Sequence, residues 1–372
     1  MLLTVLHIYG IPSFVLVTLR ERSALAEGAF SELSIVLVEM AAPQAKPQAI
    51  DPDILPRLDL EYVAFHNEHV AHLVPPHSLP WDPAIRNRDT VPGSAEVLSV
   101  GSVQDYDLSH CKVRVFTPEG SPPPEGWPAY VWYHGGGWTL GNISSENAFC
   151  SRICKGARCV VASPDYRLAP EHPYPAAVED SFETLQWVFE KGKSLLGVDP
   201  TRLAIGGSSA GGNLAAILSM KAAELKPPIP LKLAQLIVPV TDNTALHTDD
   251  RYPSWKENAN TVWLNTKRML WFRNFYVPKE EERTEWDNSP IFAPDELLAK
   301  SPKTWIAVME LDILRDEGLA YGERLKKVGV PVSHKLYAKA PHQILAMDGV
   351  LSVGRELVSD AVENLAEAFG SS

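Results

Sequence analysis

A serine flanked by glycines is the most informative chemical feature of this sequence. Residues 207–211 read Gly-Ser-Ser-Ala-Gly and lie between a short apolar run and a run of helix-forming residues. A serine on such a strand-to-helix turn is held in a strained backbone with its hydroxyl directed away from the sheet, and the following helix points free N–H groups toward it. The spacing favours Ser209, because a choice of Ser208 would put Ala210 in place of the second glycine. The pattern indicates a nucleophile that attacks carbonyl groups; a glycine-rich structural turn is the alternative.

A serine hydroxyl becomes a useful nucleophile when a base accepts its proton, and an imidazole oriented by a carboxylate is the usual arrangement. In α/β-hydrolase folds the acid and then the histidine follow the serine along the chain. Asp312 follows an expected strand at 304–309, and His342 follows an expected strand at 332–337. Both therefore stand at carboxyl ends of strands, where open sheets place their catalytic side chains. His334 falls inside the last strand and is expected in the core or at the surface.

A glycine triplet upstream offers the second part of such a site. Residues 133–138 read Tyr-His-Gly-Gly-Gly-Trp after an apolar run. Glycines let the backbone approach a ligand closely and leave N–H groups unobstructed. Together with the N–H of Ala210, these amides could bind the oxyanion of a tetrahedral intermediate. His134 precedes the loop, so we expect it to anchor the loop by hydrogen bonds rather than to act as the base.

The elements that must position these groups alternate between strand and helix from residue 97 onward. Strands are expected at 112–116, 129–133, 159–163, 203–206, 231–238, 304–309 and 332–337. Helices are expected at 178–191, 210–225, 318–327 and 352–369. This alternation predicts a mostly parallel sheet with helices on both faces. Asp316 and Glu317 stand at the start of a helix, the third of these, where acidic residues commonly interact with the N-terminal dipole.

A segment of about sixty residues after the strand ending near 240 interrupts the alternation. It is rich in aromatic residues: Tyr252, Trp255, Trp263, Trp271, Phe272, Phe275 and Tyr276. Such a length is unusual for a crossover and predicts a lid over the carboxyl edge of the sheet, where these folds bind ligands. A small helical cluster with its own aromatic core is the other interpretation, and we expect both to hold in part.

Composition narrows the class of protein. The chain has 372 residues, a net charge of −12 and four cysteines. The negative charge argues against nucleic acid and anionic membrane surfaces as partners. Four cysteines are too few for a disulfide framework, and Cys150, Cys154 and Cys159 lack the spacing of a zinc site, so we expect buried thiols and no metal.

The amino-terminal residues leave secretion and anchoring open. Residues 2–19 are apolar enough for a signal peptide or membrane anchor, but polar, glycine and proline residues interrupt them and no clear cleavage site follows. Helices packed over the active site, or an extension before an alternative start at Met40, are two other interpretations. We favour a cytoplasmic protein and expect no stable membrane insertion.

Several motifs, in one order along the chain, resemble those of the hormone-sensitive-lipase-like family of α/β-hydrolase esterases. They are His-Gly-Gly-Gly-Trp at 134–138, Asp-Tyr-Arg-Leu-Ala-Pro-Glu-His-Pro at 165–173, Gly-Ser-Ser-Ala-Gly-Gly-Asn-Leu at 207–214, Asn-Ser-Pro at 288–290 and Asp-Ile-Leu-Arg-Asp-Glu-Gly at 312–318. The resemblance runs from about residue 112 to the end. It implies an α/β-hydrolase fold, with a mostly parallel central sheet, helices on both faces and a helical cap.

The resemblance also implies a role for each site residue. It implies Ser209 as nucleophile, His342 as base and Asp312 as the acid that orients the base. It implies three backbone amides as oxyanion donors: Gly136, Gly137 and Ala210. His134 and Gly135 would shape the loop, and residues 165–173 would brace it.

The family's domain arrangement transfers to this sequence as an expectation. Residues 1–95 would form an N-terminal extension and part of the cap. Residues 96–240 and 291–372 would form the catalytic domain, and 241–290 the cap insertion. An exposed edge strand near the carboxyl end leaves a homodimer open.

Three positions depart from the family pattern. Ser208 stands where the family often has an acidic residue, Ile313 where it usually has proline, and Gln343 where it usually has glycine. No reacting group is lost, so we expect effects on pocket shape and on the hydrogen bonds around the site.

We therefore predict a serine carboxylic-ester hydrolase that acts on small to medium acyl esters without a metal or cofactor. Hydrolysis of an amide or lactone, or acyl transfer, could use the same triad. A receptor-like member would keep the fold without turnover, and the presence of all three triad residues argues against it. The sequence does not fix the natural ester.

Overall fold

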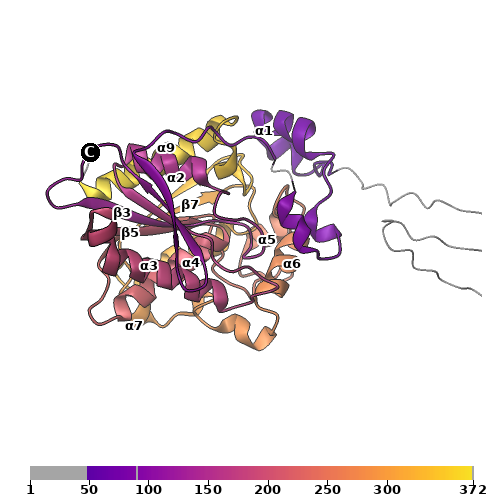
Figure 1. Cartoon of the computed structure of the whole chain (residues 1–372). Helices are drawn as coiled ribbons and strands as arrows, with labels where there is room; N and C mark the ends of the chain where they lie inside the picture. Colours follow the sequence, from indigo (N-terminus) through magenta and orange to yellow (C-terminus); the bar gives the residue numbers. More distant parts are fainter. Residues whose placement is uncertain (1–47, 89–90, 371–372) are drawn as a thin grey trace, which may run out of the picture.

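The computed structural model describes residues 48–88 and 91–370 of the chain (Figure 1). The expectations for residues 2–19 and Met40 lie outside the described residues. Within the described ranges, no helix is both long and apolar enough to cross a bilayer.

The centre of the fold is an eight-stranded sheet with the order β1-β2-β4-β3-β5-β6-β7-β8. Its strands are β1 Ser102–Asp107, β2 Lys112–Thr117, β3 Trp127–Tyr133, β4 Val160–Pro164, β5 Val198–Ser208, β6 Leu231–Ile237, β7 Thr304–Met309 and β8 Val332–Tyr337. The pairs β1–β2 and β2–β4 are antiparallel, and every pair from β4 to β8 is parallel. The predicted α/β class and mostly parallel sheet are confirmed.

Helices cover both faces of this sheet. They are α1 Leu60–Phe65, α2 Asn147–Gly156, α3 Ala176–Leu196, α4 Ala210–Glu224, α5 Pro253–Glu257, α6 Thr266–Tyr276, α7 Asp295–Leu298, α8 Arg315–Lys327 and α9 Ser352–Phe369. One core lies between the sheet and α2 and α9, while α3, α4 and α8 enclose the other (Figure 1). Successive side chains of β3 point alternately into the two cores: Trp132 packs in the first and Tyr133 in the second. Because both faces of β3 are buried, its sequence is continuously apolar.

The seven expected strands are all present, and the structure adds β1, which the sequence analysis missed. Its residues are mostly exposed, so no burial pattern marks them in the sequence. The helix expected at 318–327 begins earlier, at Arg315. The predicted exposed edge near the carboxyl end is β8, which pairs only with β7 among the described strands and has three exposed side chains.

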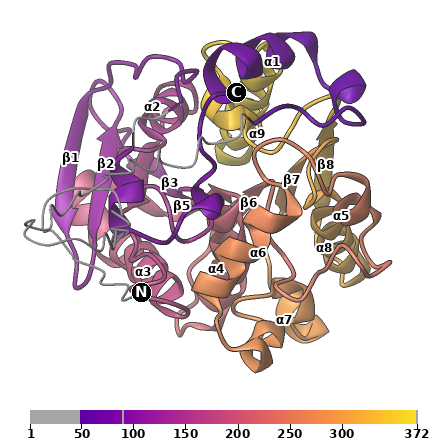
Figure 2. The same cartoon turned by 90° about the vertical axis from the view of Figure 1, so that its right-hand side faces the viewer.

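The carboxyl ends of the parallel strands lie at one edge of the sheet. The candidate site residues gather there because the glycine triplet follows β3, Ser209 follows β5, Asp312 follows β7 and His342 follows β8. The segment after β6 lies at the same edge, with α6 in front of the sheet in Figure 2. An N-terminal segment joins it: the Trp81 ring lies 5.8 Å from that of Trp271 and 5.2 Å from that of Phe275, both on α6.

Candidate active site

Ser209 occupies a sharp turn between β5 and α4. Its backbone angles are φ 54° and ψ −115°, a conformation that residues other than glycine rarely adopt. The glycines on either side make the turn possible. A Cβ on Gly211 would lie 1.9 Å from the carbonyl oxygen of Tyr133, and one on Gly207 would lie 2.2 Å from the Gly211 carbonyl. The glycine spacing that selects Ser209 in the sequence therefore has a steric cause.

His342 connects this serine to a carboxylate. Its Nε2 lies 2.9 Å from Ser209 Oγ, and its Nδ1 lies 2.6 Å from Asp312 Oδ2. Asp312 is fully buried and His342 is 5% exposed, so water competes weakly for these hydrogen bonds. With the proton on Nδ1, the imidazole donates to the carboxylate and its Nε2 is free to accept the serine proton.

The segment after β6 holds the loop that carries Asp312. Asn258 Nδ2 donates to the Asp312 carbonyl at 3.0 Å, and Thr261 Oγ1 donates to the Leu311 carbonyl at 2.7 Å. Ser254 Oγ donates to the Ile313 carbonyl at 2.7 Å. Sequence analysis missed these polar residues, since nothing in their local pattern shows a contact fifty or more residues away.

The glycine loop after β3 follows a path that only glycine allows. Gly136 has φ 120° and Gly137 has φ 61°. A Cβ on Gly136 would lie 2.1 Å from the Leu140 carbonyl oxygen, and one on Gly137 would lie 2.2 Å from the Phe272 ring. The loop thus brings its backbone beside the turn of Ser209 with no side chains in the way.

His134 lies at the base of this loop and is 1% exposed. Its Nδ1 is 2.7 Å from the Gly135 carbonyl, and its ring stacks on Tyr166 with centroids 4.2 Å apart. Tyr166 in turn donates its hydroxyl hydrogen to the His134 carbonyl at 2.7 Å. These contacts fix the start of the loop and leave His134 away from the Ser209–His342 pair.

Comparison with known proteins agrees with this fold. A family model described as alpha/beta hydrolase fold matches residues 130–346, which is more than half of the chain. This chain belongs to the alpha/beta hydrolase family. The match lies in its hormone-sensitive-lipase-like, carboxylesterase branch, and the chain is a hydrolase of carboxylesterase type.

Individual relatives cover most of its length. An AB hydrolase superfamily protein of Schizosaccharomyces pombe is 41% identical over 86% of this chain and 96% of its own. Esterase LipI of Mycobacterium tuberculosis is 36% identical over 73% of this chain and 82% of its own. Among solved structures, a thermostable esterase from Pseudomonas putida has a TM-score of 0.75 at 28% identity, covering 85% of this chain and 98% of that one.

Glu146, the residue directly before α2, is a further polar residue of the site, and sequence analysis missed it. Its Oε1 accepts from Ser208 Oγ at 2.8 Å and from the Gly135 N–H at 3.2 Å. Its Oε2 accepts a short hydrogen bond from Trp132 Nε1. One carboxylate therefore joins the serine turn to the glycine loop. The departure from the family pattern at Ser208 was the only signal of it in the sequence.

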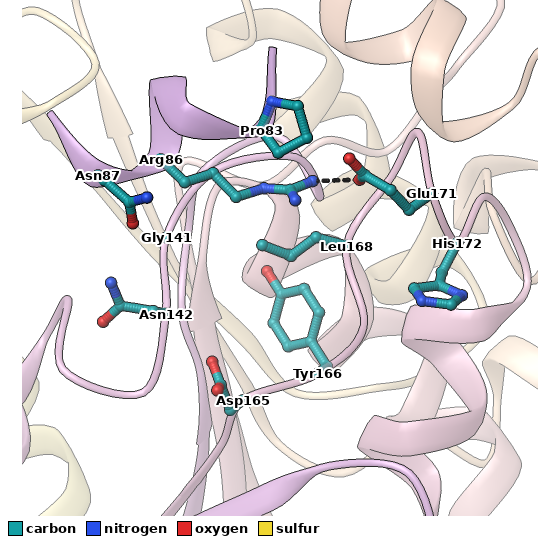
Figure 3. A pocket seen from close by; sticks show the side chains of 10 residues that line it. All are labelled: Pro83, Arg86, Asn87, Gly141, Asn142, Asp165, Tyr166, Leu168, Glu171 and His172. Atoms are coloured by element: carbon teal, nitrogen blue, oxygen red, sulfur yellow. Dashed lines mark hydrogen bonds and ion pairs between the residues drawn. The ribbon is translucent and has the colours of Figure 1, made fainter.

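The motif at 165–173 braces the neighbouring surface. Arg167 forms an ion pair of 2.8 Å with buried Asp180, and Glu171 forms one of 2.6 Å with Arg86 of the N-terminal segment. The second pair spans an open pocket of about 490 Å³ (Figure 3). Its ten lining residues include none of the three triad candidates.

Asp316 and Glu317 lie in the first turn of α8, as the sequence predicts, but their side chains bind the segment after β6. Asp316 accepts from the Ser254 N–H at 2.7 Å. Glu317 is fully buried and accepts from the Thr241 N–H and from Trp255 Nε1, both at 2.8 Å. Burial, followed by the nearby charge of Asp242, raises the pKa of Glu317 to about 8.

The three cysteines near α2 are buried thiols, as expected. Burial raises the pKa of Cys154 to about 12. A neutral, inaccessible thiol is a poor nucleophile, so we assign these residues to packing in the core between the sheet and the helices α2 and α9.

Proposed function

We propose that this hydrolase cleaves carboxylic esters of small to medium acyl groups with Ser209 as nucleophile, His342 as general base and Asp312 as the acid that orients the base. The observation that carries the proposal is the continuous pair of hydrogen bonds from Ser209 Oγ through the imidazole to Asp312. Its buried setting favours proton transfer within the triad over exchange with water.

The reaction takes place in two stages. Ser209 Oγ bonds to the acyl carbon while its proton moves to His342 Nε2, and the carbonyl oxygen becomes an oxyanion. The oxyanion accepts hydrogen bonds from the N–H groups of Gly136, Gly137 and Ala210. The intermediate then expels the alcohol, which takes the proton from His342 and leaves an acyl-enzyme.

Water completes the cycle. His342 removes a proton from the water as its oxygen bonds to the acyl carbon, and a second oxyanion forms in the same place. Its collapse breaks the bond to Ser209, which takes the proton back, and the carboxylic acid leaves. Asp312 remains ionised throughout and stabilises the imidazolium.

We also propose that residues 1–95 form an N-terminal extension and part of a cap, that 241–290 form the rest of the cap, and that 96–240 and 291–372 form the catalytic domain beneath it; residues 1–47 lie outside the described part of the chain. Contacts of the described residues support this division. Trp81 packs on Trp271 and Phe275, and the Phe272 ring lies against Gly137. An aromatic cap of this kind favours substrates with an apolar part.

The test compares the wild type with Ser209→Ala on 4-nitrophenyl esters of increasing chain length. We expect the variant to fold normally and to lose kcat on the order of a millionfold. A fluorophosphonate probe should label the wild type and not the variant. Anilides, lactones and alcohol acceptors assayed beside the esters distinguish the other uses of a triad. Near-normal turnover by folded Ser209→Ala would contradict the proposal.

A further inference from the structure

Arg268 lies on the face of α6 that meets the glycine loop. It precedes Phe272 by four residues, so the two side chains share one side of the helix. The Phe272 ring lies against Gly137, and the guanidinium carbon of Arg268 is 5.6 Å from the centre of that ring. One side of the guanidinium thus faces the ring that covers the proposed oxyanion site.

The other side of Arg268 meets the segment that supports the acid loop. Its Nη1 donates to the Trp263 carbonyl at 3.1 Å. Trp263 belongs to the same segment as Asn258 and Thr261, which bind the carbonyls around Asp312. The guanidinium therefore contacts one residue that lies against the glycine loop and one residue of the segment that holds the acid loop.

No carboxylate among the described residues pairs with Arg268. Its Nε is shielded from solvent and has no hydrogen-bond partner. This is unexpected in a chain with 46 acidic and 34 basic residues, where Arg167 and Arg315 each pair with two carboxylates. A partly buried cation without a carboxylate partner and with a shielded, unpaired Nε is costly, so such a group beside the glycine loop indicates a ligand of opposite charge.

The local field is positive as well. Burial alone lowers the pKa of Arg268 to about 10, so the group is still charged at neutral pH. Burial, with the charges of Arg268 and Lys267, lowers the pKa of nearby His77 to about 4. Burial, with the charge of Arg283, also lowers the pKa of Arg273 on the same helix to about 10, but there the charges of Glu317 and Asp242 oppose the shift, whereas no carboxylate opposes it at Arg268.

We propose that Arg268 binds a carboxylate of the substrate, so that the preferred substrates are esters that carry a negatively charged group besides the ester itself. This inference rests on the proposed ester hydrolysis and specifies its substrate class. A guanidinium offers a carboxylate two parallel N–H donors, and the aromatic residues of α6 suit an apolar spacer between the charge and the ester.

Two matched substrate pairs test this. Phenyl hydrogen glutarate and methyl phenyl glutarate differ in a carboxylate on the acyl side, and 4-acetoxybenzoate and its methyl ester differ in one on the alcohol side. We expect the wild type to favour the charged member of at least one pair by about tenfold or more in kcat/KM, the effect of a charged hydrogen bond. In Arg268→Gln this preference should disappear, because kcat/KM falls much further for the charged member than for the neutral member.

Lys267→Gln is the matched control, because it removes the same charge from the adjacent, exposed position. It should keep the preference; an equal loss in both variants would mean that only the general field acts. Inhibition of the wild type by benzoate but not by benzamide gives a readout that needs no variant. A wild type that hydrolyses neutral esters and prefers neither charged substrate overturns the inference and leaves the proposed function standing. Failure on all four esters counts against the proposed function itself.

Discussion

Ser208 donates its hydroxyl hydrogen to Glu146 over 2.8 Å, directly before the proposed nucleophile in the chain. The same carboxylate accepts from the Gly135 N–H at 3.2 Å and from the Trp132 indole. The acidic group that the family pattern leads one to expect at 208 is thus supplied from the start of α2. It fixes the distance between the serine turn and the glycine loop.

Glu146→Ala should therefore reduce kcat more than it raises KM. The variant frees the glycine loop relative to Ser209, and misplacement by about 1 Å can cost on the order of a hundredfold in rate. Steady-state kinetics on one neutral ester gives both parameters. Ser208→Ala should have a smaller effect because it removes only one of three contacts.

The double variant checks that the two residues act together. If Ser208 works through Glu146, the double variant should be no slower than Glu146→Ala alone. Multiplied effects would show that the residues act separately, and an unchanged kcat in Glu146→Ala would contradict the positioning role.

The sequence predicted the parts of the site that depend on local sterics. Gly207, Gly211 and the triplet at 135–137 are required by close backbone approaches, so their spacing alone marks the turn and the loop. Hydrophobic patterns predicted the order of strands and helices. That order showed which residues follow parallel strands and therefore reach the same edge of the sheet. Seven of the eight strands were predicted because burial leaves a pattern in the sequence, whereas exposed β1 has none.

What the sequence could not predict depends on contacts between distant segments. Glu146 bonds to a residue 62 positions away, and Asn258 to one 54 positions away. Glu317 fits a helix start by its position, yet its carboxylate binds Thr241. Local patterns give such residues a plausible role at the surface or a helix end, and only the packed chain shows their partners.

Gly137→Ala should reduce kcat about a hundred- to a thousandfold, the usual effect of losing an oxyanion donor. The new Cβ would lie 2.2 Å from Cγ of the Phe272 ring, so the loop or the ring must move. Because the obstruction is the Phe272 side chain, Phe272→Ala in the same chain should restore part of the rate. Discontinuous assays, in which samples are quenched at set times and the enzyme is in excess over substrate, measure these slow rates.

Gly120→Ala is the control for backbone strain. Gly120 also has a positive φ, of 92°, but a Cβ there would meet nothing within 4 Å. Its kcat should match the wild type. An equal loss of rate in Gly120→Ala would attribute the effect at Gly137 to general destabilisation.

Asp312→Asn should reduce kcat by about 10⁴-fold while the protein stays folded. The carboxylate accepts from His342 Nδ1 at 2.6 Å and keeps the proton on that nitrogen. An amide that donates there instead would favour the other tautomer, whose Nε2 is unable to accept the serine proton. The comparison is with Asp316→Asn, a nearby acid that binds Ser254, which should lose stability and little kcat. Equal rates in the two variants would remove Asp312 from the mechanism.

Glu317 should make the protein less stable as the pH rises. Burial raises its pKa in the folded chain from the ordinary value of 4.5 to about 8. Between these values the folded chain holds a proton that the unfolded chain has lost, so the free energy of unfolding falls with rising pH, by at most about 1.4 kcal/mol per pH unit. The contribution is complete below pH 4.5 and is lost as the pH passes 8.

Glu317→Gln isolates this contribution, because glutamine does not ionise in that range. The variant should be less stable at acidic pH, since its amide gives up one acceptor for the Thr241 N–H or Trp255 Nε1. Its unfolding free energy, measured with urea between pH 5 and 8.5, should decline less steeply than that of the wild type, so the two curves approach each other. Parallel curves would mean that Glu317 is ionised throughout, held by its N–H donors against the effect of burial.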